Sequence, residues 1–224
     1  MSDYSQVLPR VFIGNAAAAR DVQFFNRYKI NFVINVTESE INYFESETNK
    51  KKLLRVEDTC VKYLSLALSD TCSTNLSCHF PQTNQFITGC LSSNKNTLLI
   101  HCKCGVSRSS SVLLAYLISV KQMTLDTALK LIKKERRRIR PNVGFFLQLL
   151  QLEKNIFENT DCNETAVWKP SLSPHIYCEI PEETWVLMMK VASSNELPTQ
   201  INEKQYKLLS KLAFRGRKKR RIRK

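Results

Sequence analysis

The spacing of apolar and polar positions predicts strands and helices in alternation over the first two thirds of the chain. Short apolar runs rich in β-branched residues are typical of strands, and four occur, at residues 11–13, 32–36, 61–68 and 97–100. Apolar residues repeated every three or four positions indicate helices, over residues 16–28, 81–91 and 109–120, from Thr124 onward, and after Pro141. Asn15 and Thr124 stand where helix caps are expected.

This order of elements predicts an α/β domain. Strands alternate with helices early and helices cluster late, which favours a central, mostly parallel sheet flanked by helices. The segment 109–120 is apolar almost all round, so we expect it at the centre of the domain. Near Asn159 the composition shifts toward proline and small polar residues. We therefore expect a domain over residues 1–158, an extension that is partly ordered at most over 159–214, and a basic tail over 215–224.

Composition excludes several classes of protein. Hydrophobic residues make up 43% and charged residues 24%, which is the usual globular mix and excludes a wholly disordered chain. The longest apolar stretch, residues 112–118, is seven residues long and far too short to span a membrane. The first residues lack a secretory signal, and eight cysteines without such a signal indicate reduced thiols. We expect an intracellular soluble protein, in the nucleus, the cytoplasm or both.

The most informative segment joins the last predicted strand to the central helix and reads His-Cys-Lys-Cys-Gly-Val-Ser-Arg-Ser at residues 101–109. Six consecutive backbone N–H groups of this loop can curl around one anion at the positive end of the helix. They belong to Lys103, Cys104, Gly105, Val106, Ser107 and Arg108. Gly105 permits a tight turn, and the guanidinium fork of Arg108 matches two phosphate oxygens. The loop is therefore expected to bind phosphate.

Cys102 lies at the start of this loop, where positive surroundings can lower the pKa of a thiol from about 8.5 toward roughly 3.5–7.5. The thiolate would face the phosphorus of a bound phosphate and act as a nucleophile. The reaction implied is phosphoester hydrolysis through a cysteinyl-phosphate. Because the loop amides and Arg108 supply the charge stabilisation, we expect no metal and no cofactor.

The motif His-Cys-x-x-Gly-x-x-Arg-Ser at residues 101–109 resembles the signature loop of the cysteine-based protein tyrosine phosphatases. Residues 115–118 and 140–145 resemble the dual-specificity subfamily, particularly its small atypical members. The similarity runs from about Leu8 to about Phe157. It implies a protein tyrosine phosphatase-like fold, with a central sheet flanked by helices, and a catalytic domain over residues 1–158.

The reaction needs a general acid to protonate the leaving oxygen. Asp70 follows the strand predicted over 61–68, whose end can lie beside the end of the strand over 97–100. Asp70 also precedes Cys102 by 32 positions, and the resemblance implies the same residue, because the family's acid occupies this strand-end loop upstream of the cysteine. Asp58 is the alternative, but it lies before the strand and therefore at its wrong end.

The resemblance also implies three supporting residues. Ser109 would hydrogen-bond the cysteine sulfur and help it leave, and its position at the helix start also fits an N-cap. His101 would orient the loop and support the thiolate. Asn142 would brace the loop.

Two loop residues set this sequence apart. Relatives commonly carry a small or acidic residue at the position of Cys104, which here places a second thiol two residues from Cys102. A redox partnership of the two thiols is one interpretation, although a disulfide across so short a loop would be strained. Lys103 makes the pocket more basic, as in some relatives that act on phosphoinositides.

The leading hypothesis is a protein phosphatase that acts on phosphotyrosine and on phosphoserine or phosphothreonine, with phosphorylated proteins, kinases among them, as partners. Only about ten residues precede the first predicted strand, which leaves little room for the loop that deepens the pocket in tyrosine-only relatives. A phosphatase for RNA 5′ ends or inositol lipids is the alternative, although relatives acting on RNA usually carry His where Cys104 stands. A catalytically dead phosphoprotein-binding module is disfavoured, because Cys102, Arg108 and Asp70 are all present.

Positive charge is concentrated in two places. Lys and Arg exceed Asp and Glu by 14, and residues 215–224 alone carry eight Lys or Arg. A second cluster, residues 133–140, carries six. The tail is typical of a nuclear-localisation signal, read by an import receptor, or of a segment that binds polyanions such as nucleic acid. The cluster at 133–140 is expected to face acidic or phosphorylated substrates.

Overall fold

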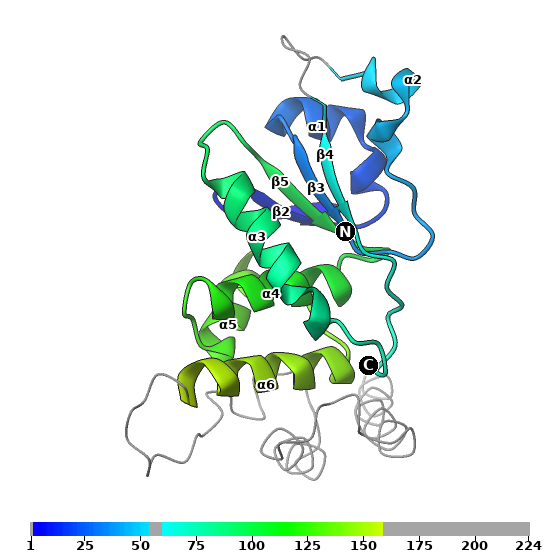
Figure 1. Cartoon of the computed structure of the whole chain (residues 1–224). Coiled ribbons are helices and arrows are strands. Elements are labelled where there is room, and N and C mark those ends of the chain that lie inside the picture. Colours follow the sequence, from blue (N-terminus) through cyan, green and yellow to red (C-terminus); the bar gives the residue numbers. More distant parts are fainter. Residues whose placement is uncertain (1, 54–59, 159–224) are drawn as a thin grey trace, which may run out of the picture.

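The structure, a computed structural model, describes residues 2–53 and 60–158 (Figure 1). A sheet of five strands lies at its centre, in the order β1-β2-β5-β3-β4. Four strands run parallel, namely β2 (Val11–Gly14), β5 (Leu98–His101), β3 (Phe32–Asn35) and β4 (Lys62–Ser65), and β1 (Tyr4–Leu8) lies antiparallel to β2 at one edge. The predicted mostly parallel sheet flanked by helices is confirmed.

Helices pack on both faces of this sheet (Figure 1). One face carries α1 (Val22–Tyr28) and the short turns η1 (Ala18–Arg20) and η2 (Tyr43–Glu45), with α2 (Glu47–Lys50) beside η2. The other face carries η3 (Ser77–His79), α3 (Phe80–Leu91), α4 (Arg108–Ser119), α5 (Leu125–Glu135) and α6 (Val143–Glu158). Along β5 the side chains alternate between the faces, because Leu99 packs with the α1 side while Leu98 and Ile100 pack with the α4 side.

The helix predicted over 16–28 is wrong in its first half. Asn15 does cap the turn that follows it, since its Oδ1 accepts a hydrogen bond from the N–H of Ala18 at 2.9 Å, but only η1 forms there. Asp21 then adopts an extended backbone conformation, and its Oδ1 accepts from the N–H of Phe24 at 3.1 Å. A second capping residue within the apolar run therefore ends one short helix and begins α1.

Two strands also differ from the sequence-based expectation. The sequence does not predict β1, whose residues are Tyr-Ser-Gln-Val-Leu. They form a strand by pairing with β2 at the edge of the sheet. The strand predicted over 61–68 is shorter, since β4 covers only Lys62–Ser65 and pairs with β3 alone. An edge strand ends where its single partner ends, so the apolar residues that follow continue as a loop.

Three parallel strands end at the same edge of the sheet and so position the loops that follow them. Gly14 and Asn35 both pair in register with His101, which places the carboxyl ends of β2, β3 and β5 together. The chain leaving β5 enters α4, in which residues 108–118 are all buried, as expected for the central helix. In parallel sheets this edge is where ligands bind.

Some expectations concern residues outside the described part of the chain. These are the extension over 159–214, the basic tail over 215–224 and the alternative acid Asp58. Among residues 2–53 and 60–158, no helix combines the length and the apolar character that crossing a membrane would require.

Candidate active site

The loop between β5 and α4 wraps around the sulfur of Cys102. The Cys102 side chain is only 1% exposed, and its N–H bonds the carbonyl of Gly14 at the end of β2, at 3.4 Å. The sulfur accepts a hydrogen bond from the N–H of Gly105 at 3.2 Å and lies 3.3 Å from the Oγ of Ser109. The loop and the first turn of α4 therefore hold one sulfur between them.

Gly105 is the residue that allows the loop to close. Its φ is +64°, a left-handed conformation that side chains disfavour. A Cβ at this position would also lie 2.5 Å from the carbonyl oxygen of Gly14 and 2.8 Å from Nη2 of Arg136. The loop thus needs glycine both for its backbone conformation and for its close approach to β2.

Arg136 links the loop between β5 and α4 to strand β1, a role that the sequence does not predict. This side chain is only 3% exposed, and its Nε donates to the carbonyl of Gly105 at 2.9 Å while Nη1 donates to the Oγ of Ser5 in β1 at 3.1 Å. The expectation that the cluster 133–140 faces substrates is therefore wrong for Arg136. The sequence does not distinguish Arg136 from the basic residues beside it. Its burial depends on where α5 ends, directly before it.

The pKa of the Cys102 thiol lies below its ordinary value. Burial is the largest influence and raises the pKa, but hydrogen bonds from the Ser109 hydroxyl, from the N–H groups of Ser109 and Val106, and the positive charge of Arg108 together outweigh it. The surroundings of the sulfur thus favour the thiolate, which is the nucleophilic form.

Arg108 and Asp70 meet beside this loop. Arg108 is buried, its Nη1 donates to the carbonyl of Leu68 at 2.8 Å, and its Nε lies 3.8 Å from Oδ2 of Asp70. Oδ1 of Asp70 accepts from the hydroxyl of Ser107 at 2.6 Å. The loop that follows β4 is therefore bound, through Leu68 and Asp70, to the side chains of Ser107 and Arg108 at the start of α4.

Asn142 completes the link between Asp70 and the loop that joins β5 to α4. Its Nδ2 donates to Oδ1 of Asp70 at 2.8 Å, and its backbone N–H donates to the Oγ of Ser107 at 3.0 Å. Its Oδ1 accepts from the N–H of Phe145 at 2.9 Å and so caps the start of α6. One residue thus orients the carboxylate, the loop and a helix.

His101 is buried at the end of β5 and is neutral. Burial, followed by the nearby charge of Arg20, lowers the pKa of its imidazole to about 4. Nδ1 is buried and has no hydrogen-bond partner among the described residues. Any support that His101 gives to the neighbouring sulfur therefore comes from its place in the strand rather than from a positive charge.

The remaining loop residues divide into buried and exposed ones. Ser107 is buried, whereas Lys103 and Cys104 are exposed, so a lysine and a second thiol lie on the rim. Ser109 lies within the first turn of α4 and its hydroxyl faces the sulfur, which corrects the expectation that it caps the helix. The cap position belongs to Ser107, whose hydroxyl donates to Asp70 instead of capping.

The fold thus brings four predicted residues, Cys102, Arg108, Asp70 and Asn142, close together. A thiol with a lowered pKa, a buried guanidinium and a carboxylic acid group come from two loops at the carboxyl edge of the sheet, and an amide from the start of α6 joins them. Such a set can bind a phosphate group, attack its phosphorus and protonate a leaving oxygen.

A family model matches most of the described part of the chain. Residues 11–155 match the model described as "Dual specificity phosphatase, catalytic domain". The chain is 33% identical to dual specificity protein phosphatase 9 of Homo sapiens over 151 residues, which are 67% of this chain and 36% of that protein. It is also 33% identical to dual specificity protein phosphatase 22 of Mus musculus over 154 residues, which are 69% of this chain and 76% of that protein. The chain therefore spans about a third of the first relative.

Solved structures share the fold. Human DUSP28 superposes with a TM-score of 0.60 at 24% identity, covering 70% of this chain and 97% of that chain. DUSP15 superposes with a TM-score of 0.54 at 26% identity, covering 71% of this chain and 98% of that chain. The sheet and helices described above therefore recur in solved phosphatase domains.

Proposed function

Because the chain belongs to the dual specificity phosphatase family, we propose that it hydrolyses phosphotyrosine and phosphoserine or phosphothreonine in proteins through a cysteinyl-phosphate. The proposal rests above all on Cys102, a buried thiol whose pKa is lowered by Ser109, loop amides and Arg108. Asp70, on the neighbouring loop, supplies the acid.

In the first step the Cys102 thiolate attacks phosphorus, an S–P bond forms and the bond to the ester oxygen breaks. The leaving alkoxide or phenoxide takes a proton from Asp70. Arg108 and the loop amides stabilise the negative charge on the other phosphate oxygens. Asn142 and Ser107, which hydrogen-bond Asp70 in the structure, orient the acid.

In the second step a water molecule attacks the phosphorus of the cysteinyl-phosphate. Asp70, now a carboxylate, accepts a proton from this water, inorganic phosphate forms and the S–P bond breaks. The thiolate that leaves recovers the hydrogen bonds of Gly105 and Ser109. These two contacts favour departure of the sulfur because they stabilise its negative charge.

The nucleophile is tested by Cys102→Ser in the full chain. We expect hydrolysis of an aryl phosphate by the parent protein without added metal, inhibition by vanadate, and no measurable turnover by the variant. The variant should still bind a phosphotyrosine peptide in calorimetry, because Arg108 and the loop amides remain. A variant that keeps most of its activity would refute the role of Cys102.

The acid is tested by Asp70→Asn. An amide of similar shape keeps the contacts to Asn142 but donates no proton to the ester oxygen. We expect kcat to fall by on the order of 10²–10⁴ on phosphoserine peptides, and far less on an aryl phosphate whose leaving group needs little protonation. Equal losses on both substrates would contradict the assignment.

A second substrate class is favoured by Lys103, which is exposed and directly follows Cys102 in the chain. An exposed cation there fits substrates with further phosphates, such as an inositol lipid or the 5′ end of an RNA. The discriminating measurement compares kcat/KM on doubly phosphorylated kinase-loop peptides, phosphoinositides and 5′-triphosphate RNA. The protein phosphatase proposal requires the peptides to be the best substrates, and failure on all three would favour a binding module.

A further inference from the structure

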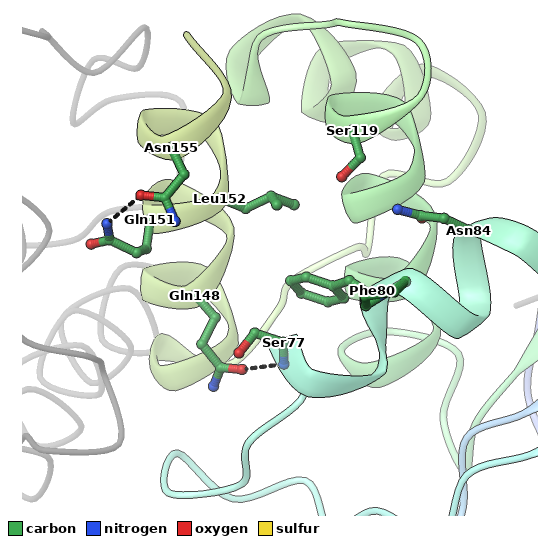
Figure 2. A pocket seen from close by; sticks show the side chains of 9 residues that line it. Ser77, Phe80, Asn84, Ser119, Gln148, Gln151, Leu152 and Asn155 are labelled. Atoms are coloured by element: carbon green, nitrogen blue, oxygen red, sulfur yellow. Dashed lines mark hydrogen bonds between the residues drawn. The ribbon is translucent and has the colours of Figure 1, made fainter. Parts of the chain in front are cut away.

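A groove of about 280 Å³ lies between η3, α3, α4 and α6 (Figure 2). Its apolar part consists of Phe80, Pro81 and Leu152. Its polar part consists of serine and amide side chains, namely Ser77, Asn84, Ser119, Gln148, Gln151 and Asn155. Cys102, Arg108 and Asp70 do not belong to this lining, so the groove is a second site on the domain. Two of its residues, Ser77 and Gln148, also bond each other and so join α6 to the chain that follows Asp70.

The chemistry of the groove favours a neutral, partly apolar occupant. None of its nine lining side chains is ionisable. Asn84 and Gln151 add a specific demand, because Asn84 Oδ1 and Gln151 Oε1 are both buried and accept no hydrogen bond from the described residues. A buried acceptor of this kind is stabilised by an N–H donor. An apolar side chain that carries an N–H, such as an indole, meets both requirements.

We propose that this groove binds the segment 185–189 of the same chain, Trp-Val-Leu-Met-Met. This run is apolar throughout and carries one indole N–H at Trp185. The basic tail over residues 215–224 does not fit, because it carries eight Lys or Arg and the groove offers no acidic partner.

The connection between the two parts permits this contact. Gln148 and Asn155, both in α6, line the groove, and the chain continues directly beyond the end of that helix at Glu158. With a rise of about 1.5 Å per residue, Gln148 lies about 15 Å from the helix end. Trp185 follows Glu158 by 27 positions, and a chain can extend by up to about 3.3–3.6 Å per residue, so the connection is long enough. The segment therefore reaches the groove, and its tether gives it a high effective concentration there.

Tryptophan fluorescence of the full chain tests the proposal directly. The protein has two tryptophans, Trp168 and Trp185, and both follow residue 158. In a Trp168→Phe background, emission therefore comes from Trp185 alone. We expect a short emission wavelength and weak quenching by acrylamide, and both should persist on dilution because the occupant belongs to the same chain.

Two groove variants and one control complete the test in this background. Leu152→Arg places a charge in the neutral groove, and Ser119→Phe fills it from α4. Each should shift the Trp185 emission to longer wavelength and raise acrylamide quenching several-fold, with an unchanged far-ultraviolet circular dichroism spectrum. Ile41→Arg, at a position 71% exposed and absent from the groove lining, should change neither signal.

Three results would overturn the proposal. The first is a parent emission typical of a solvent-exposed indole. The second is an emission that Ser119→Phe and Leu152→Arg both leave unchanged. The third is a short-wavelength emission that is lost on dilution, since this would identify the occupant as a segment of a second copy.

Discussion

At Cys102, burial and hydrogen bonding act on one thiol in opposite directions. Burial alone would raise its pKa, and the contact from the Ser109 hydroxyl is the strongest of the influences that lower it. The structure places that hydroxyl 3.3 Å from the sulfur, in the first turn of a buried helix. The nucleophilic state of Cys102 therefore depends on a neighbour that need not touch the substrate.

Ser109→Ala should raise the pKa of Cys102. A hydrogen bond to a charged group is worth about 1.5–3 kcal/mol, and its loss disfavours the thiolate relative to the thiol. The rate of alkylation by iodoacetamide, measured against pH, reports this shift. Ser110→Ala is the matched control, because the Ser110 hydroxyl donates to the backbone carbonyls of Val106 and Ser107. A profile for Ser109→Ala that coincides with the parent profile would refute the assignment.

Residue identities could be predicted where chemistry and spacing act together. The loop motif around Cys102 and Arg108, and the position of Asp70 after a strand, predict residues that the structure brings close together. The burial of Arg136 could not be predicted in this way. This burial depends on where α5 ends relative to Gly105 in the loop between β5 and α4. Such a tertiary contact cannot be predicted from a run of basic residues.

At the scale of elements, α6 determines the position of the acid loop, which is the loop after β4 that carries the proposed acid Asp70. Gly144, in the first turn of α6, packs so closely on this loop that a Cβ there would overlap the carbonyl of Cys72. One turn further on, Gln148 accepts from the N–H groups of Leu76 and Ser77 at 2.8 Å each. The helix therefore contacts the chain on the carboxyl side of Asp70 at two points.

Gly144→Ala should displace the acid loop. Overpacking of this kind costs about 1–3 kcal/mol of stability, and because Cys72 is two residues from Asp70, activity on phosphoserine peptides should fall more than activity on an aryl phosphate. Gly89→Ala is the matched control: it lies in α3, and a Cβ there meets nothing within 4 Å. It should raise stability by about 0.5–1 kcal/mol. Thermal unfolding and the two rates measure these effects, and equal rate losses would exclude displacement of the acid.

Element types were predictable where the pattern is long and unambiguous. The apolar segment that became α4 and the capped helix at Thr124 agree with the structure, in which the Thr124 side chain accepts from the N–H of Thr127. The split between η1 and α1 could not be predicted, because the sequence alone allows Asp21 to be an exposed residue within one continuous helix. Its extended backbone conformation shows instead that it caps α1. Strand β1 depends on its partner β2.

At the scale of the whole molecule, a buried neutral His101 makes stability depend on pH. The pKa of its imidazole is about 4 in the folded protein, against an ordinary value near 6.5. Between these values the unfolded chain binds a proton that the folded chain does not. The free energy of unfolding therefore contains a contribution that is complete above pH 6.5 and is lost as the pH falls toward 4. From the size of the shift, this contribution is about 3 kcal/mol.

His101→Asn removes the titrating group and should flatten this dependence. We expect the parent protein to lose about 3 kcal/mol more stability than the variant between pH 7 and pH 4, whatever the packing cost of the substitution at pH 7. Urea unfolding at several pH values measures the difference. Parallel curves for the two proteins would show that His101 titrates normally in the fold.

The contacts that hold Asp70 have a consequence for the timing of entropy loss. Ser107 and Asn142 bond its carboxylate, and Gln148 fixes the segment that follows. Ordering a backbone residue costs roughly 1–2 kcal/mol in conformational entropy. Here that cost falls once, when the chain folds, and does not recur with each substrate. In the proposed mechanism, the binding energy of a phosphorylated substrate is then available to align the ester with Asp70, which folding has already positioned.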